Sequence, residues 1–202
     1  MMLRILGKIP RRVTVACSGG VDSISIVHFL LQGKRKVDLA FFNHGTQHSN
    51  KAEQFVKEYA AKNKLVLCVS GVKGYRGKRS FEEFWRDERY GFLESLKSKF
   101  IVTGHHLDDV VETWLMSAMH GNPKLIPYKR NNIYRPFLPT ERKAFLLYAQ
   151  RKGLEWIEDP SNKDTNYMRN YTRHNIIPHA LKINPGIRKT IRKKILETYI
   201  DL

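Results

Sequence analysis

The stretch VTVACSGGVDS, residues 13–23, decides the fold, because it joins a short apolar run to a glycine turn. Apolar and β-branched residues in such a run are typical of a buried strand, and Gly19-Gly20 predicts the turn that ends it. Apolar residues then recur at helical spacing from Ile24 to Leu31, before Gly33. The stretch therefore predicts a strand, a tight turn and a helix in immediate succession.

The same alternation of strand and helix continues along the chain. Further strands are predicted at residues 37–42, 65–69 and 100–103, and a helix follows each of them, the last one reaching His120. This order predicts an α/β fold, a parallel sheet with helices on both faces. In such sheets ligands bind beyond the carboxyl ends of the strands.

The pattern changes after Gly121. Four prolines interrupt residues 122–139, and mainly helical segments follow them. We therefore divide the chain into an α/β nucleotide-binding domain, residues 1–121, and a helical extension, residues 122–202. We expect the extension to contribute to the active site and to RNA binding.

The sequence SGGVDS lies where the first strand passes into the first helix. Glycines let the backbone approach an anion, and the free N–H groups and positive dipole end of the helix favour phosphate. We expect Ser18, Gly19, Gly20 and Ser23 to hold the phosphates of a nucleotide. Asp22 cannot contact phosphate directly, so it either binds Mg²⁺ or stabilises the start of the helix.

Two further strand ends contribute to the predicted nucleotide site. Asn43 and His44 follow the second strand, and Gly104 follows the fourth. Because the carboxyl ends of parallel strands meet at one edge of the sheet, we expect Asn43 and His44 to flank an adenosine. The alternative for these two is a polar turn without a ligand. Gly104 is assigned to the same site.

The sequence HHLDDVVET after Gly104 holds a second group of reactive side chains. At helical spacing His105, Asp109 and Glu112 share one face, while Asp108 points away and is placed to cap the helix. An imidazole and two carboxylates at a strand end either hold a metal ion, or bind a substrate ammonium group and accept its proton. A solvated polar helix start is the alternative without a function.

The chain is strongly basic. It holds 36 Lys and Arg against 19 Asp and Glu, a net charge of +17 over 202 residues. Such a charge favours a polyanionic partner, nucleic acid above all, over a merely soluble basic surface. Arginines and lysines on predicted helices and loops suit phosphate, unless they form surface ion pairs or cover a solvated tail helix. The candidate RNA-binding residues are Lys78, Arg79, Arg86, Arg89, Arg188, Lys189, Arg192, Lys193 and Lys194.

Two cysteines, Cys17 and Cys68, exclude a zinc site of four cysteines and a disulfide framework. Both lie in strand-like apolar runs, so we expect two buried free thiols. The first twelve residues are too short and too basic for a signal peptide, and no apolar run reaches the ~18 residues of a membrane span. These features predict a cytoplasmic protein without a membrane partner.

Taken together, the motifs resemble those of one family. SGGVDS is identical to the SGGxDS loop, called the PP-loop, of enzymes that split ATP into AMP and pyrophosphate. The order SGGVDS, NHG, GHHLDDVVET, RPFL, and EDPSN through RNYTR, between about residues 12 and 185, resembles the tRNA(Ile)-lysidine synthetases. The last part, EDPSN through RNYTR, separates this family from other PP-loop enzymes.

The resemblance implies a two-step reaction with ATP and Mg²⁺ as cofactors. The substrate is an isoleucine tRNA with a CAU anticodon. The 2-oxygen of its wobble cytosine attacks the α-phosphate of ATP, and free L-lysine then displaces AMP at carbon 2 of the base.

The resemblance also implies roles for individual residues. Asp22 and Asp109 are the implied metal ligands, and Asp109 and Glu112 would hold the lysine amino groups with help from His105. One of the two arginines of RNYTR, Arg169 or Arg173, would neutralise the activated phosphate. The residues implied in catalysis are Asp22, His105, Asp109, Glu112, Arg169 and Arg173.

Two departures from the family pattern stand out. His120-Gly121 occupies the place where the family usually has Arg-Gly. The sequence stops at Leu202, whereas most members continue into domains that grip the tRNA acceptor stem, so we expect a short form. A homodimer is compatible with the sequence.

Two other functions stay open at this point. One is a different PP-loop chemistry such as RNA thiolation, although the strand positions of Cys17 and Cys68 do not suit a reactive pair. The other is a relic that binds RNA or nucleotide without turnover. The intact SGGVDS loop and the residues of GHHLDDVVET argue against decay.

Overall fold

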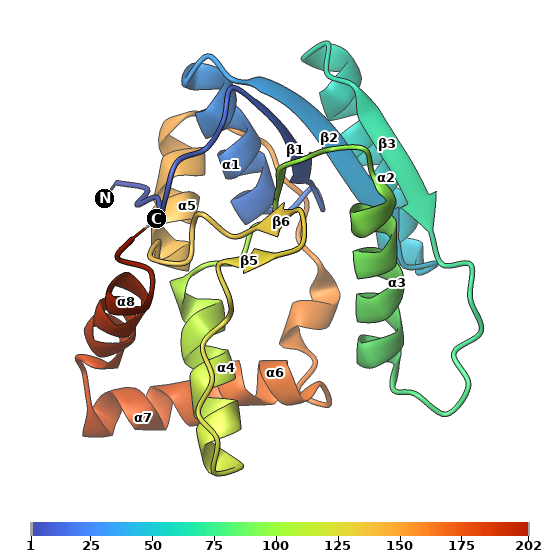
Figure 1. The fold of residues 1–202 in the computed structure, drawn as a ribbon. Helices are drawn as coiled ribbons and strands as arrows, with labels where there is room; N and C mark the ends of the chain where they lie inside the picture. The colour runs from blue at the N-terminus through green and yellow to red at the C-terminus, as the bar shows by residue number, and fades with distance from the viewer. Residues whose placement is uncertain (1, 202) are drawn as a thin grey trace.

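The protein folds around a six-stranded sheet (Figure 1). The computed structural model describes residues 2–201. The strand order is β3-β2-β1-β4-β6-β5, in which β5 pairs antiparallel with β6 at one edge and all other pairs are parallel. The strands are β1 (Arg12–Ala16), β2 (Lys36–Asn43), β3 (Leu67–Gly71), β4 (Ile101–Val102), β5 (Lys129–Arg130) and β6 (Ile133–Tyr134).

Helices cover both faces of the sheet, with α1 and α5 side by side on one of them (Figure 1). The helices are α1 (Val21–Gln32), α2 (Gln47–Lys62), α3 (Phe81–Ser95), α4 (Leu107–Met119), α5 (Arg142–Arg151), α6 (Met168–Tyr171), α7 (Ile177–Ile183) and α8 (Ile187–Thr198), with a 3₁₀ turn η1 (Pro160–Lys163) and a π-helical turn η2 (Thr172–Ile176). This arrangement confirms the predicted α/β class with a helical C-terminal part.

Alternate residues of the strands face separate cores, because side chains point to opposite faces with a period of two. Val15 and Leu39 are buried on the face that α1, α2 and α5 cover. Ala40 and Ile101 pack on the other face with Tyr90 of α3. The sheet is therefore held between two helical layers, and its carboxyl edge is left for a site.

The helices at the C-terminal end form a third cluster. Ile187, Ile191 and Ile195 of α8 are buried, and they pack in the same cluster as Val110 and Val111 of α4. Because α8 is fixed against α4, the last part of the chain is tied to the helix that carries the predicted catalytic residues.

Residues 122–139 are expected to form a loop with at most a short hairpin, and the structure contains such a hairpin. They supply β5 and β6, and β6 pairs parallel with β4. The division into residues 1–121 and 122–202 remains a prediction, although α5 of the second part packs on α1 of the first.

One expectation about the cysteines is wrong. Cys17 is buried, but Cys68 is exposed. Cys68 lies on β3, which is the edge strand of the sheet, and local sequence alone does not distinguish an edge strand from a central one. Among residues 2–201, no helix has both the length and the apolarity needed to cross a membrane.

Candidate functional site

The junction of β1 and α1 forms a bare helix start at the carboxyl edge of the sheet. Gly20 is the N-cap of α1, and no side chain of the described residues caps this end. Gly19 has a φ of +82°, which favours glycine, and a Cβ there would lie 3.0 Å from Ile157 Cγ2. The N–H groups of residues 21–23 have no partner within the helix, so this end suits an anion.

The serines of this loop stabilise its shape. Ser23 Oγ donates to the Gly20 carbonyl oxygen at 3.0 Å and lies 3.4 Å from Ser18 Oγ. The Ile157 N–H donates to the Gly19 carbonyl oxygen at 2.9 Å, which fixes the loop from the outside. The loop is thus held in shape within the protein, and its free backbone N–H groups suit phosphate.

Asp22 points from this loop towards the start of α4. Its Oδ2 lies 3.8 Å from His106 Nε2. Its Oδ1 is buried and accepts no hydrogen bond from the described residues. Burial raises the pKa of Asp22, and the nearby His106 opposes that rise. A buried carboxylate oxygen without a donor is suited to a cation.

The side chain of Asn43 is hydrogen-bonded to the loop and helix that follow it. Its side-chain nitrogen donates to Glu53 Oε2 at 2.6 Å and to Asn50 Oδ1 at 3.0 Å. Its Oδ1 accepts from the Gly45 N–H at 2.8 Å and from Ser49 Oγ at 2.7 Å. Both ends of the amide are occupied, and they fix the start of α2. That Asn43 flanks an adenosine stays a prediction, which a backbone or packing contact would have to fulfil.

His44 and Gly104 line the site more directly. His44 lies 5.5 Å from Trp85 between ring centroids, and its buried Nδ1 has no partner among the described residues. Burial lowers the pKa of His44 to about 4, and the charge of Arg89 acts in the same direction. A Cβ on Gly104 would lie 3.7 Å from Asp22 Cβ, so this residue packs against the phosphate loop.

α4 begins later than its spacing suggested, and a different residue caps it. His106 is the N-cap: its Nδ1 accepts from the Asp109 N–H at 3.3 Å, and the His106 N–H donates to Asp109 Oδ2 at 3.0 Å. Two donors at the helix end are thereby satisfied reciprocally. His106 is the capping residue that the spacing argument missed, and the doubled histidine before a helix start was the available signal.

The prediction that Asp108 caps α4 is wrong. Asp108 Oδ2 accepts from the Arg142 N–H at 2.8 Å, and its Oδ1 accepts from Arg188 Nε at 2.9 Å. Asp108 therefore ties the starts of α5 and α8 to α4, a contact between segments that are distant in the sequence.

Two carboxylates and two arginines form a partly buried cluster on α4, α6 and η2, in which only Glu112 is fully buried. Arg173 Nε and Nη2 donate to the two oxygens of Glu112 at 2.6 Å and 3.1 Å. Arg169 Nη1 lies 4.0 Å from Asp109 Oδ1, and Arg173 Nη2 lies 3.8 Å from the same oxygen. We call Asp109, Glu112, Arg169 and Arg173 the carboxylate–arginine cluster.

Burial and charge act differently on the two carboxylates of the cluster. Burial raises the pKa of Glu112, against the hydrogen bond from Arg173. Burial by itself would also raise the pKa of Asp109, but His106, His105 and Arg169 outweigh it and lower this pKa. Asp109 is therefore the firmly ionised member, and Glu112 is the one more easily protonated.

His105 stands before the helix and not on its face. Its Nδ1 lies 2.8 Å from Thr103 Oγ1. Burial lowers the pKa of His105 to about 3, and Asp109 only partly opposes this. The ring is neutral at physiological pH, so it suits hydrogen bonding better than proton uptake.

The arginines of the cluster come from a helix with an irregular turn. Arg169 lies in α6 and Arg173 in the π-helical turn η2. The sequence predicted a helix from Asn166, with a break at Pro178. π turns inside helices are rare and frequently mark functional sites, and here the turn carries Arg173 against Glu112 of α4.

The predicted metal ligands differ in how well they suit Mg²⁺. Asp22 offers a free buried oxygen, whereas both Asp109 oxygens already face donors. In the described part of the chain no group of three or more His, Cys, Asp and Glu side chains is arranged to hold a metal ion. Mg²⁺ usually takes one or two carboxylates with substrate phosphates, so Asp22 fits such a site.

Several predicted RNA-binding arginines have partners within the protein. Arg188 pairs with Asp108, and Arg192 pairs with Glu141 and donates to the Pro139 carbonyl oxygen. These two arginines lie beside the buried isoleucine stripe of α8, so the predicted basic residues of this helix do not form one exposed face. The exposed cations that remain on α8 are Lys189, Lys193 and Lys194, of which Lys193 lies 3.7 Å from Glu197 Oε1 through its Nζ.

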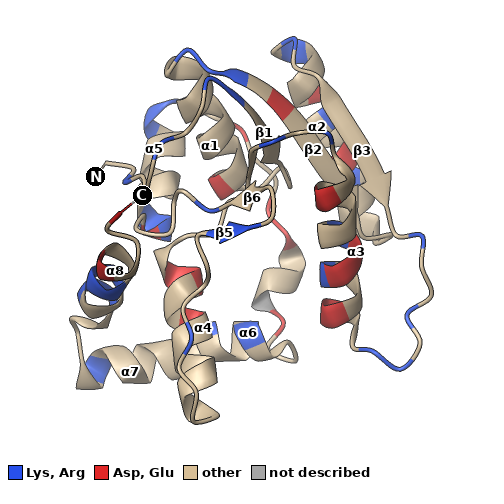
Figure 2. Cartoon of the chain, in the orientation of Figure 1, with Lys and Arg blue, Asp and Glu red and all other residues tan. Residues whose placement is uncertain are grey.

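The basic residues near α3 divide in the same way. Arg79 Nη1 lies 3.3 Å from Asp87 Oδ2, while Lys78 and Arg86 are exposed. Arg89 is half-buried and acts on the pKa of both His44 and His105, so it faces the site. Figure 2 shows cations on α8, on α6 and along the loop between β3 and α3.

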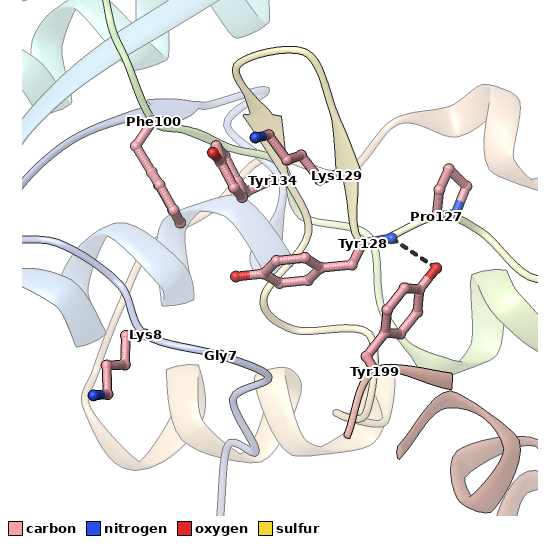
Figure 3. A pocket seen from close by; sticks show the side chains of 8 residues that line it. All are labelled: Gly7, Lys8, Phe100, Pro127, Tyr128, Lys129, Tyr134 and Tyr199. Atoms are coloured by element: carbon pink, nitrogen blue, oxygen red, sulfur yellow. Dashed lines mark hydrogen bonds between the residues drawn. The ribbon is translucent and has the colours of Figure 1, made fainter. Parts of the chain in front are cut away.

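A cavity of about 440 Å³ lies away from these residues. It is lined by aromatic side chains, among them Phe100, Tyr128 and Tyr134, with no Asp, Glu or His (Figure 3). Phe100 and Tyr134 stack on each other with centroids 3.8 Å apart, and the Tyr128 N–H donates to Tyr199 Oη at 3.0 Å. These groups pack mutually and offer no chemistry to the site.

The comparisons with known proteins agree with this geometry. A family model described as a PP-loop domain matches residues 3–180. A tRNA(Ile)-lysidine synthase of Persephonella marina is 34% identical over 197 residues, which cover 89% of this chain and 44% of that protein. A tRNA(Ile)-lysidine synthase of Nitrosomonas europaea is 32% identical, with 89% and 43% covered. The chain thus spans about half the length of the curated relatives it matches, and the motif resemblance is confirmed.

A solved structure shares the fold. The U34-tRNA thiolase NcsA from Methanococcus maripaludis, with its [4Fe-4S] cluster, aligns with a TM-score of 0.73 over 98% of this chain and 77% of that one. The sequences are 17% identical, so the likeness concerns the architecture of the sheet and its helices.

Proposed function

Because this chain belongs to the PP-loop domain family, we propose that it acts as an ATP-dependent ligase on tRNA, of the tRNA(Ile)-lysidine synthase type. One observation carries the proposal: the bare start of α1 meets the carboxylate–arginine cluster at one edge of the sheet, with Asp22 and His106 between them. The bare start of α1 suits a triphosphate, and the carboxylate–arginine cluster suits an activated phosphate beside an amine.

The phosphate loop would act in the first step. The 2-oxygen of a cytosine bonds to the α-phosphorus of ATP, and the bond to pyrophosphate breaks. N–H groups at the start of α1 would hold the departing phosphates. Asp22 Oδ1 would bind Mg²⁺, which neutralises charge on pyrophosphate when it is bound.

The carboxylate–arginine cluster would act in the second step. The ε-amine of lysine bonds to carbon 2 of the base, AMP leaves with the former 2-oxygen, and an amine proton passes to a carboxylate. Glu112 is the better acceptor of the two, because burial raises its pKa. His105 would orient the amine by hydrogen bonding. Arg169, which Glu112 and Asp109 hold, would face the leaving phosphate.

Exposed cations around the site would position the RNA. Lys78 and Arg86 lie near the start of α3, and three lysines of α8 point to solvent. A cytosine in an anticodon loop is single-stranded, so it leaves its stack at low cost.

Transfer of labelled lysine tests the proposal. Protein, ATP, Mg²⁺, labelled L-lysine and total tRNA are incubated, and the RNA is separated and counted. We expect label in the RNA, dependent on ATP, with equal amounts of AMP and pyrophosphate released. RNA without label, despite ATP turnover, would refute the lysine step.

RNA thiolation has less support as a rival. Cys17 is buried, which raises the pKa of its thiol, and Cys68 is exposed on the edge strand. Within the described residues the two thiols form no reactive pair. Sulfur incorporation from a sulfur donor into tRNA would nevertheless establish the rival directly.

A further inference from the structure

His106 occupies a position where an imidazole is unusual. It is the N-cap of α4, a place where Ser, Thr, Asp and Asn prevail because a short side chain suffices. The residue is only 4% exposed, and its ring lies 6.3 Å from that of Phe145 between centroids. Capping alone would need only an asparagine, so the second ring nitrogen calls for an explanation.

The helix cap fixes the tautomer of this ring. Nδ1 accepts the Asp109 N–H at 3.3 Å, and a ring nitrogen that accepts a hydrogen bond carries no proton. The proton of the neutral ring therefore lies on Nε2. Two carboxylate oxygens lie beside Nδ1, Asp109 Oδ2 at 3.4 Å and Asp108 Oδ2 at 4.0 Å.

The proton on Nε2 faces the phosphate loop. Asp22 Oδ2 lies 3.8 Å from Nε2, which is longer than a hydrogen bond, so the N–H acts on this carboxylate as a nearby dipole, while Asp22 Oδ1 has no donor among residues 2–201. The imidazole thus stands between Asp22 and Asp109, two carboxylates that disfavour each other's charge. It presents an N–H to one of them and accepts from the backbone of the other.

We infer that His106 is a positioning residue: its Nε2–H orients the Asp22 carboxylate, so that Oδ1 points into the nucleotide site, and its Nδ1 ties this orientation to Asp109 of the carboxylate–arginine cluster. The inference rests on the proposed function, because it links the adenylation half of the site to the lysine half. A ring with two distinct nitrogens performs both tasks, which no single short capping residue does.

Two substitutions separate the two nitrogens. In His106→Asn the amide oxygen takes the place of Nδ1, so the cap is kept and the N–H towards Asp22 is lost. In His106→Gln the amide nitrogen takes the place of Nε2, so the N–H is kept and the cap is lost. We measure the melting temperature and the tRNA-dependent release of pyrophosphate for both variants and the wild type.

The two variants are expected to fail in opposite ways. His106→Asn keeps the wild-type melting temperature but loses roughly 10- to 100-fold in kcat/KM for pyrophosphate release, the usual effect of removing a group that orients a ligand residue. Its requirement for Mg²⁺ rises, while the KM for lysine stays unchanged. His106→Gln loses about 2–4 °C of melting temperature, and its pyrophosphate release falls clearly less than that of His106→Asn because the N–H towards Asp22 is kept.

Stabilisation by ATP with Mg²⁺ gives a second readout that needs no tRNA. The ligands should raise the melting temperature of the wild type and of His106→Gln, but much less that of His106→Asn. If both variants lose stability and ligand response together, or if His106→Asn matches the wild type, the inference is wrong.

The same readout separates this inference from the proposed function. A wild type that ATP stabilises but that transfers no lysine refutes the proposed function only, and the contrast between the two variants still decides on His106. A wild type that ATP and Mg²⁺ do not stabilise refutes both.

Discussion

The starts of α1 and α4 lie side by side at the carboxyl edge of the sheet, yet they are built in opposite ways. α1 begins at a glycine N-cap without a side-chain bond, so its first N–H groups are left for a ligand. α4 begins with a reciprocal cap between His106 and Asp109, so its donors are satisfied within the protein. Asp22 and His106, 3.8 Å apart, connect the two.

The difference shows how one sheet edge serves two kinds of chemistry. A bare helix end is a positive, preformed site for phosphate. A capped helix end needs no ligand for its N–H groups. Its first turns can therefore present ionised side chains, here the carboxylates that hold Arg169 and Arg173. The predictions below exchange or remove these features.

Adding a charged cap to α1 should have the largest effect. Gly20 has a φ of −73°, and a Cβ there would lie 3.5 Å from Ser18 Oγ, so Gly20→Asp is tolerated sterically. Aspartate favours the helix start but repels phosphate by about 4 kcal/mol at 4 Å with an effective dielectric constant near 20. ATP affinity, measured by calorimetry, should fall roughly a thousandfold while the protein stays folded.

Gly20→Ser is the matched control for this experiment. It supplies a neutral cap at the same position, so the loss of ATP affinity should be much smaller. Equal losses in both variants would show that shape and not charge decides binding at this helix start.

Removing Arg173 should destabilise the region around the start of α4 and leave the structure of the start of α1 unchanged. In Arg173→Met the fully buried Glu112 loses its bidentate partner and keeps only Arg169 at 3.9 Å. A buried charge that loses its partner lowers the free energy of unfolding by about 3 kcal/mol. Urea denaturation of the variant measures this loss. The double variant Arg173→Met with Glu112→Leu should recover most of it, and a further loss there would contradict the pairing.

Asp22→Asn tests the electrostatics of the bare end through pH. Because burial raises the pKa of Asp22 above its ordinary 3.8, the folded state favours the protonated carboxyl. Its stabilising contribution is present below pH 3.8 and is lost as the pH rises through the raised value. Without Mg²⁺, the melting temperature of Asp22→Asn relative to wild type should therefore rise with pH above 3.8. A difference that does not change with pH would contradict this; Asp201→Asn is the exposed control.

The smallest effect should come from the surface beside the capped end. Replacing Lys189, Lys193 and Lys194 of α8 by glutamine removes exposed cations while Arg188 keeps its contact with Asp108. We expect the KM for tRNA to rise several-fold and its salt dependence to weaken, since fewer phosphates are contacted. The control is to replace three exposed lysines on or beside α2 by glutamine, which changes the net charge of the protein by the same amount. If that control raises the KM equally, α8 has no special role.

The bare end was predictable from sequence, because everything that makes it is local. A β-branched run, two glycines and a helical stripe lie within residues 13–33, and they suffice for strand, turn and helix. The match to the PP-loop followed from the same segment, whereas the resemblance to one family also needed the later motifs up to RNYTR.

The capped end was less predictable, because distant contacts decide its geometry. The spacing of His105, Asp109 and Glu112 assumed one continuous helix, whereas α4 starts at Leu107 and His105 stands outside it. The ion pair of Arg188 with Asp108 spans 80 positions of the sequence. No local pattern indicates such a pairing.

A crystal structure with a non-hydrolysable ATP analogue and Mg²⁺ tests the central claim most directly. The account predicts phosphate oxygens within hydrogen-bonding distance of the N–H groups at residues 20–23, a metal ion on Asp22 Oδ1, and no nucleotide contact to the donors of the α4 cap. A triphosphate bound elsewhere, for example in the aromatic cavity beside Tyr128 and Tyr134, would contradict it.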